Sequence, residues 1–180
     1  MDAIETKRLL LRNFRPEDAE DLYAYLHQPT APCFFSMALK DRNAAEDEAG
    51  QRSESDEYLA VCLKDTGRLI GDVFAMPEED TYSIGWNFNP EFGGQGYATE
   101  AAQALLTHLF TTVKARRLYA YVEEVNAPSR RLCERLGMRQ EAMFIEFVSF
   151  ENDANGDPIY ENTAQYALLK KEWALRSRLS

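Results

Sequence analysis

Hydrophobic and polar positions alternate along residues 81–88, and this alternation predicts a half-buried β-strand. Tyr82, Ile84, Trp86 and Phe88 are separated by smaller or polar residues, as expected of a strand with one face in a core. Beyond a glycine-rich join, apolar residues recur at the three- and four-residue spacing of an amphipathic helix; they are Ala98, Ala101, Ala102, Leu105, Leu106, Leu109 and Val113. We therefore expect a strand, a tight turn and a helix in succession.

The same patterning divides the rest of the chain into short elements. Strands are expected over residues 8–14, 59–63, 68–76, 118–122, 138–150 and 160–169, and helices over 16–26 and 127–136, with a further polar helix over 41–54. Dense turn formers, above all residues 65–67 and 152–158, separate neighbouring strands. Residues 28–40 show no regular pattern. The element order predicts one α/β (α+β) domain over residues 1–180, with a mixed sheet and helices on its faces.

Composition narrows the class of protein. The net charge of −10 argues against a nucleic-acid partner, which needs a basic surface. Cys33, Cys62 and Cys133 are odd in number and lack the spacing of metal ligands, which indicates reduced thiols in a cytoplasmic protein and no metal site. No apolar run approaches the length that crosses a membrane. The oligomeric state stays open, a homodimer included.

The join between the predicted strand and helix contains three glycines within residues 93–96. Glycine lets successive backbone N–H groups converge, and the unpaired N–H groups at a helix start add a partial positive charge. Such a turn suits a pyrophosphate, whereas the alternative is a tight turn whose glycines serve packing alone. The spacing matches neither the Walker loop, which needs Gly-Lys-Ser/Thr, nor the dinucleotide pattern Gly-x-Gly-x-x-Gly.

A second segment, residues 126–138, begins Asn-Ala-Pro-Ser and ends Leu-Gly-Met. Together the two segments resemble the GNAT acetyltransferase superfamily, and more closely its branch of ribosomal-protein N-terminal acetyltransferases (RimJ/RimL-like). The family loop Q/R-x-x-G-x-G/A is matched by residues 93–98, with Gly93 in place of the leading side chain, and its Thr-Glu-Ala by 99–101. The family segment N-x-x-S…L-G-F/M is matched by the second segment. The two ends of the chain, residues 6–12 and 166–173, also resemble this branch.

The resemblance implies a GNAT fold, a mixed and mostly antiparallel sheet with helices on both faces. Its central strands would splay apart, one ending near Phe88 and the other beginning near Leu118, with the pantetheine arm of acetyl-CoA in the gap. The residues that it assigns to the cofactor are Phe88, Gly94, Gln95, Gly96, Tyr97, Ala98, Thr99, Asn126, Ser129, Arg130 and Arg131, with the N–H groups of 94–99 on the pyrophosphate. Helix capping is the alternative for Asn126, and a solvated face is the alternative for the arginine pair.

The function implied is acetyl-CoA-dependent transfer of an acetyl group to a primary amine, directly within a ternary complex. A protein N-terminal amine is the simplest acceptor. The alternatives are a small-molecule amine (a polyamine, aminoglycoside or amino sugar) and a non-catalytic acyl-CoA-binding sensor. Relatives often carry an aspartate where this chain has Asn162, which weakens the transfer of a ribosomal-protein substrate.

Candidates for proton transfer follow from the same comparison with the family. Many relatives place a tyrosine acid where this chain has Cys133, so Cys133 and Ser129 are the candidate proton donors, although Cys133 also suits a buried helix position. The candidate base is Glu146, because it alternates with Phe144 and Val148 on a predicted strand. A cross-strand salt bridge or an exposed edge is the alternative for Glu146.

Overall fold

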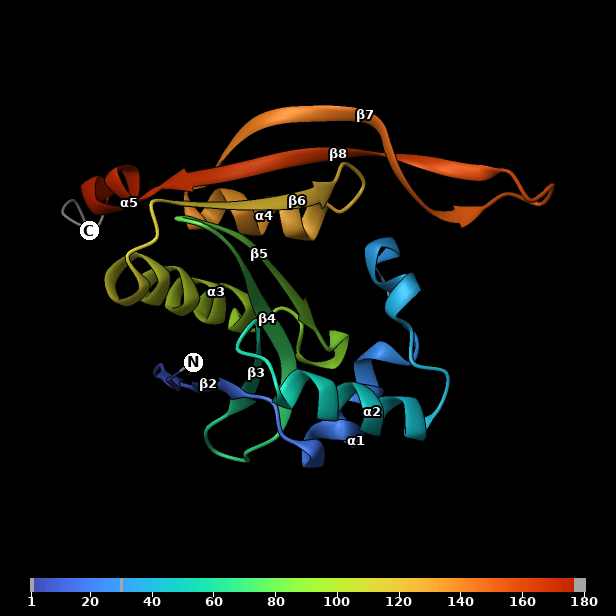
Figure 1. The fold of residues 1–180 in the computed structure, drawn as a ribbon, viewed down its shortest axis with the longest axis horizontal. Helices are drawn as coiled ribbons and strands as arrows, with labels where there is room; N and C mark the ends of the chain where they lie inside the picture. The colour runs from blue at the N-terminus through green and yellow to red at the C-terminus, as the bar shows by residue number, and fades with distance from the viewer. Residues whose placement is uncertain (1, 30, 177–180) are drawn as a thin grey trace.

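The computed structural model describes residues 2–29 and 31–176. Over these residues, eight strands form one sheet in the order β1-β2-β3-β4-β5-β6-β8-β7 (Figure 1). The strands are β1 Ile4–Glu5, β2 Leu9–Asn13, β3 Tyr58–Leu63, β4 Leu69–Glu78, β5 Thr81–Phe88, β6 Arg117–Glu123, β7 Arg139–Asn152 and β8 Pro158–Leu169. The α-helices are α1 Ala19–Leu26, α2 Arg42–Ser53, α3 Tyr97–His108, α4 Ala127–Leu136 and α5 Lys170–Arg176. Short 3₁₀ turns are η1 Pro16–Asp18, η2 Pro32–Met37 and η3 Pro90–Phe92, and a π-helical turn, η4 Leu109–Val113, extends α3.

The sheet splits between β5 and β6. Every other pair of neighbouring strands is antiparallel, whereas β5 and β6 are parallel and pair only from Thr81 with Arg117 to Ser83 with Tyr119. Strand β5 continues to Phe88 and β6 to Glu123 without further pairing between them. The predicted splay of the central strands is therefore confirmed.

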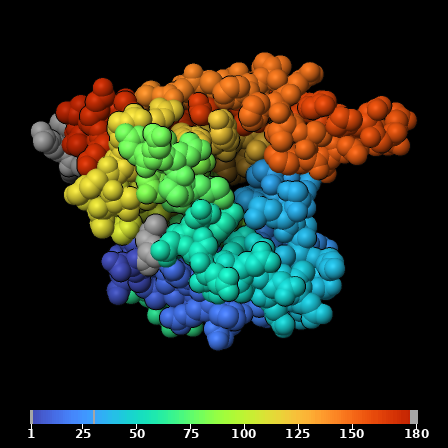
Figure 2. Space-filling model, in the orientation of Figure 1, coloured from blue at the N-terminus to red at the C-terminus, as the bar shows by residue number. Residues whose placement is uncertain are grey.

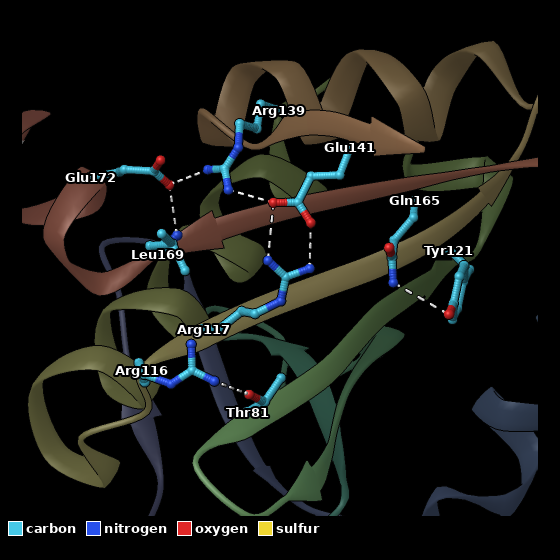
Figure 3. Close-up of polar contacts among 9 residues, drawn as sticks. All are labelled: Thr81, Arg116, Arg117, Tyr121, Arg139, Glu141, Gln165, Leu169 and Glu172. Atoms are coloured by element: carbon cyan, nitrogen blue, oxygen red, sulfur yellow. Dashed lines mark hydrogen bonds and ion pairs between the residues drawn. The ribbon is translucent and has the colours of Figure 1, made fainter. Parts of the chain in front are cut away.

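Ion pairs hold the strands together at the end of the sheet where β5 and β6 still pair (Figure 3). Arg117 of β6 makes a bidentate contact with Glu141 of β7, and Glu141 also contacts Arg139. Arg139 contacts Glu172 of α5, whose carboxylate accepts the N–H of Leu169 at 2.9 Å. Because β5 and β6 pair only at this end, the gap between them opens toward the other end, where β5 leads into the glycine-rich loop.

Helices cover both faces of the sheet, and each face has its own apolar core. On one face α3 and α4 pack together, with Leu105, Phe110 and Leu132 among the buried residues. On the other face lie α1 and α2, with Leu22 and Ala49 buried. Successive residues of a strand point to opposite faces, so β3 serves both cores, with Leu59, Val61 and Leu63 in the first and Ala60 and Cys62 in the second. The predicted helices on both faces are confirmed.

The predicted elements are present, and the structure adds three that patterning did not reveal. Strand β1 has two residues and depends on pairing with β2. Helix α5 follows directly from β8. Turn η2 lies in the segment expected to be irregular, and it contacts β7. Figure 2 shows this blue segment against the underside of the orange β7–β8 hairpin, whose far end extends beyond the rest of the molecule. The turn and the hairpin thus close one side of the split.

Candidate functional site

The loop after β5 has the backbone shape expected of an anion site. Gly94 and Gly96 have φ of +75° and +81°, and Gly96 is the residue before the first turn of α3. Gly93 N–H donates to the carbonyl of Pro90, but no N–H group of residues 94–99 finds an acceptor within the described part of the chain. Free N–H groups at a helix start are a ready site for a phosphate. The geometry fits the diphosphate of a nucleotide-like ligand.

Thr6 and Arg8, near the N-terminus, form hydrogen bonds to this loop and to the first turn of α3. Arg8 donates from its guanidinium to the carbonyl of Gln95 at 3.0 Å and to the carboxylate of Glu100 at 2.7 Å, and it lies over the ring of Tyr97. The hydroxyl of Thr6 also donates to Glu100, at 2.6 Å. Partial burial raises the pKa of Glu100, but the hydrogen bonds from Thr6 and Arg8 outweigh it, so the pKa of Glu100 lies below its usual value. Glu100 therefore connects the first turn of α3 to Thr6 and Arg8.

A cavity of about 1010 Å³ runs from this loop along the split. Eight of the predicted cofactor residues line it: Phe88, Gly94, Gly96, Tyr97, Ala98, Thr99, Asn126 and Ser129. Gln95, Arg130 and Arg131 do not line it. The wall opposite β5 comes from the start of α4 and from residues near η2, including Pro32 and Phe34. Two sequence segments about thirty residues apart thus meet across one cavity.

The arginine that faces this cavity is not one of the two predicted. Arg130 donates to the hydroxyl of Tyr166 at 3.3 Å and to the carbonyl of Glu124 at 3.2 Å, and Arg131 is exposed. Arg135, in the last turn of α4, lines the cavity and donates to the hydroxyl of Thr99 at 3.4 Å. Arg135, and neither Arg130 nor Arg131, therefore lies at the loop, while the cofactor role expected of Arg130 and Arg131 stays a prediction.

A second cavity of about 320 Å³ lies deeper in the split. Its walls include five aromatic residues and two methionines, which are Phe34, Tyr58, Phe74, Trp86, Tyr121, Met37 and Met76. Turn η2 supplies Cys33, Phe34 and Met37, so this turn forms one wall. Cavities that bind small molecules have this mainly apolar character.

The two cavities share five lining residues, Phe34, Trp86, Asn87, Asn126 and Ser129. We call this set the junction. At the junction the hydroxyl of Ser129 accepts the indole N–H of Trp86 at 3.2 Å, and the N–H of Ser129 donates to the side-chain oxygen of Asn126 at 3.2 Å. The amide nitrogen of Asn87 is buried and has no hydrogen-bond partner. Unused donors therefore lie where a ligand in one cavity would meet a ligand in the other.

Ion-paired side chains form part of the wall of the smaller cavity. Arg52 donates to Asp72 at 2.9 Å and to Glu48 at 2.7 Å, and the hydroxyl of Tyr25 donates to Asp72 at 2.7 Å. Burial disfavours the charge of Arg52, yet Asp72 and its other anionic neighbours raise its pKa. Asp72 thus has a cationic partner within the protein.

Glu123, at the end of β6, lines the smaller cavity, and the sequence did not single it out. It is only 6% exposed. Its neighbour Glu124 is exposed and accepts the side-chain N–H of Asn162 at 2.8 Å. Burial, together with the charge of Glu123 and a hydrogen bond to it, raises the pKa of Cys33 to about 12. The sequence does not distinguish Glu123 from Glu124, because the position of β6 in the sheet decides which of the two side chains points inward.

Two predicted catalytic residues lie outside both cavities. The alternation that suggested Glu146 is broken by irregular pairing between Phe144 and Val148, and Glu146 is an exposed residue at φ +49°. Glu146 therefore does not lie on an apolar strand face as its alternation indicated, and its role as base stays a prediction. Cys133 is 0% exposed in the core, where burial raises its pKa to about 12. Of the three predicted catalytic residues, Ser129 alone lines the cavities.

Residues 2–29 and 31–176 contain neither a candidate metal site nor a candidate membrane-spanning helix. No group of three histidine, cysteine, aspartate or glutamate side chains could hold a metal ion there. None of the described helices is long and apolar enough to cross a membrane.

Comparison with known proteins gives consistent similarities. The sequence profile of the "Acetyltransferase (GNAT) domain" family matches residues 8–139. A Bacillus subtilis protein, "Uncharacterized N-acetyltransferase YnaD", is 32% identical over 94% of this chain and 98% of its own length. The crystal structure of an acetyltransferase (GNAT family) from Bacillus anthracis is similar with a TM-score of 0.85 and 29% identity, over 95% of this chain and 100% of that one. A ribosomal-protein-S5-alanine acetyltransferase from Vibrio fischeri shares the fold, with a TM-score of 0.73 and 16% identity, over 96% of this chain and 99% of that one.

Proposed function

The chain belongs to the acetyltransferase (GNAT) domain family and is an N-acetyltransferase, and from this premise we propose that it moves the acetyl group of acetyl-CoA directly to a primary amine. The observation that carries the proposal is the junction, where a long cavity that begins at free N–H groups meets a smaller apolar cavity. Two ligands that enter from opposite sides would meet there without a covalent enzyme intermediate. Since the chain is an enzyme, the alternative of a non-catalytic acyl-CoA sensor is wrong.

Acetyl-CoA fits the larger cavity by its chemistry. Its diphosphate would accept the N–H groups of residues 94–99, with the guanidinium of Arg135 nearby as a cation. Its pantetheine amides would meet the unpaired backbone of β5 and β6, as an added strand does. This direction brings the thioester toward Asn126 and Ser129.

Ser129 is the proton donor that we propose for the departing thiolate. Its oxygen accepts the Trp86 N–H, which leaves its own hydroxyl hydrogen free to point into the junction. The thiol of CoA resembles an ordinary thiol with a pKa of about 8.5, so an acid assists its departure without being indispensable. Cys133, which is buried away from both cavities, is not proposed for this role.

The acceptor must attack as a neutral amine. A peptide N-terminus has a pKa of about 7.7–8.0, so roughly a quarter of it is neutral near pH 7.4. An alkyl amine has a pKa of about 10.4, so its protonated form exceeds its neutral form about a thousandfold at that pH. The smaller cavity is at the low end of the volumes that hold small ligands, and turn η2 closes one wall. The small volume of this cavity and the wall formed by η2 favour a small-molecule amine, with a peptide N-terminal residue as the second candidate. The Vibrio fischeri relative is too distant to transfer its peptide acceptor, since 16% identity supports the fold alone.

One assay tests this proposal. Thiol release from acetyl-CoA is measured with alkyl and aralkyl amines, polyamines, aminoglycosides and short peptides. We expect release that depends on the acceptor, together with intersecting initial-rate lines and no acetyl adduct on the protein by mass spectrometry. Absence of acceptor-dependent release across the panel, or a stable acetyl adduct with parallel lines, would contradict direct transfer to an amine. Turnover confined to peptides would select the second candidate.

A further inference from the structure

Glu123 is a buried carboxylate without a cationic partner in the described part of the chain. It is 6% exposed, and no lysine, arginine or histidine among the described residues forms an ion pair with it. Removing a carboxylate from water without a counter-charge is costly. Among the described residues, its side chain has the thiol of Cys33 as a partner, and a thiol is a weak donor. A cation in the ligand would complement this position, since none of the described residues supplies one.

The other acid that lines this cavity does not share the deficit. Asp72 accepts from Arg52 and from the hydroxyl of Tyr25, so it has a cationic partner within the protein, although its burial outweighs these contacts and raises its pKa. Glu123 is left as the unbalanced carboxylate among the lining residues. A single positive charge in the ligand is the complement of this arrangement. A polyamine would instead bring several positive charges into a cavity that has one free negative charge.

The remaining wall of the cavity indicates which chemical group could be attached to the amine of the ligand. It includes five aromatic rings and two methionine side chains, which bind apolar groups, and the ring faces can also bind an ammonium. Tyr121, on the same strand as Glu123, lines this cavity and packs against Phe147, with ring centroids 5.8 Å apart. An amine joined to an apolar or aromatic group matches this part of the lining.

We infer that Glu123 receives the ammonium of an apolar primary amine in place of the Cys33 thiol and takes its proton before acetyl transfer. This inference rests on the proposed function. In the step, one N–H proton moves to the Glu123 carboxylate, and the nitrogen lone pair then attacks the thioester carbonyl carbon. As the C–S bond breaks, the Ser129 hydroxyl donates its proton to the CoA sulfur. The second proton on the nitrogen then replaces the proton that Ser129 has given up. The products are the N-acetyl amine, CoA thiol and a protonated Glu123 that returns its proton to water.

Other titratable groups face the same cavity from neighbouring elements. They are Cys33 of η2, Tyr58 of β3, Tyr121 of β6, and the ion-paired Arg52 of α2 and Asp72 of β4. A change of pH alone would act on several of them. The test therefore varies the pKa of the amine rather than relying on a pH profile.

The experiment compares Glu123→Gln with two matched changes, Glu124→Gln and Glu146→Gln. Glu124 adjoins Glu123 but lines neither cavity, and Glu146 is the rival base. The acceptors are phenethylamine and its fluorinated analogues, whose lower pKa leaves more neutral amine near pH 7. Acetyl-CoA binding is measured by calorimetry for every variant, and folding by circular dichroism.

For Glu123→Gln we expect kcat/KM for phenethylamine to fall by about 10²–10⁴-fold while acetyl-CoA affinity stays within twofold. The loss should shrink for the fluorinated amines, since a neutral amine needs no base; a purely structural defect would affect all of them equally. Glu124→Gln should match the wild type. Glu123→Asp, which keeps the charge, should retain more activity than Glu123→Gln.

Four results would overturn the inference. They are wild-type kcat/KM in Glu123→Gln, a loss that does not depend on amine pKa, a loss in Glu146→Gln instead, and turnover of spermidine but not of phenethylamine. If Glu123→Gln does not fold, Glu123→Ala takes its place, and kcat/KM within twofold of wild type in that variant would contradict the inference in the same way. A wild-type protein that binds no acetyl-CoA and acetylates no amine would instead reject the proposed function itself, which separates the two failures.

Discussion

At the scale of single residues, two backbone positions give the loop after β5 its shape. Gly94 and Gly96 both have positive φ, and a Cβ at either position would meet no close neighbour. The requirement for glycine is therefore conformational rather than steric. For a residue with a side chain, this region costs about 1–2 kcal/mol. The free N–H groups of the proposed diphosphate site depend on this conformation.

Replacing Gly96 with leucine should weaken acetyl-CoA binding at least about tenfold, because the loop would relax and turn N–H groups away from the diphosphate. Calorimetric titration with acetyl-CoA measures the change. The matched control is Gly156→Leu, since Gly156 has φ of +92° and open space around it but lies in the β7–β8 turn. The control should lose stability without losing affinity. Equal affinity of folded Gly96→Leu and wild type would disprove the diphosphate site.

Glu100 gives a prediction about pH. Its pKa in the folded protein is lowered, so its contribution to stability is complete above the unfolded-state pKa of about 4.3 and is lost as the pH falls through the folded-state value. Urea unfolding should therefore show Glu100→Gln to be less stable than wild type by about 1–2 kcal/mol at pH 7. The difference should decrease below about pH 4. A difference that is constant from pH 7 to pH 3 would show that the charge of Glu100 is not responsible.

At the scale of elements, the pairing of β4 with β5 shapes the smaller cavity. Gly85 of β5 lies opposite Phe74 of β4, and a Cβ at Gly85 would come within 2.1 Å of the Phe74 ring. The ring therefore occupies the space above Gly85, and both residues line the cavity. The register of two strands thus sets how far an aromatic ring projects into the proposed acceptor site.

Gly85→Ala should displace the Phe74 ring and raise KM for the acceptor by about fivefold to thirtyfold, from overpacking of about 1–2 kcal/mol. Affinity for acetyl-CoA should be unchanged, since Gly85 does not line the larger cavity. Initial rates at saturating acetyl-CoA measure KM. Gly50→Ala is the control, because a Cβ there has nothing within 4 Å. An unchanged KM in Gly85→Ala would show that the ring does not limit the acceptor site.

At the scale of the whole molecule, the split divides the sheet into two parts that pair directly only between residues 81–83 and 117–119. The larger cavity has walls from both parts, with β5 and the start of α3 on one side and α4 on the other. A ligand that contacts both walls would add contacts across the split. Ligand binding and overall stability should therefore be coupled.

Acetyl-CoA at one hundred times its Kd should stabilise the protein by about 2.7 kcal/mol, which corresponds to a rise in Tm of about 5–10 °C for a chain of this size. Thermal unfolding followed by circular dichroism measures the shift. Gly96→Leu should show a smaller rise at the same acetyl-CoA concentration, while Gly156→Leu should show the full rise from its own lower starting point. No rise in wild type would mean that acetyl-CoA does not bind the folded protein.

The sequence by itself determined the elements and the glycine-rich turn after β5. Apolar spacing is a local property, so the strand at residues 81–88 and the helix after it were predictable from the chain alone. The glycines at 94 and 96 were informative for the same reason, because positive φ restricts the residue type at that position. Resemblance to the GNAT family then indicated that the strands splay, which no periodicity could reveal.

Only the tertiary structure decided which side chains meet in the split. Arg135 rather than Arg130 or Arg131 reaches the loop, because helix packing selects one arginine of α4. Glu123 turns into a cavity while Glu124 faces out, and bulged pairing in β7 exposes Glu146. In each case the choice depends on contacts between segments far apart in the chain, and local patterns of polarity do not encode those contacts.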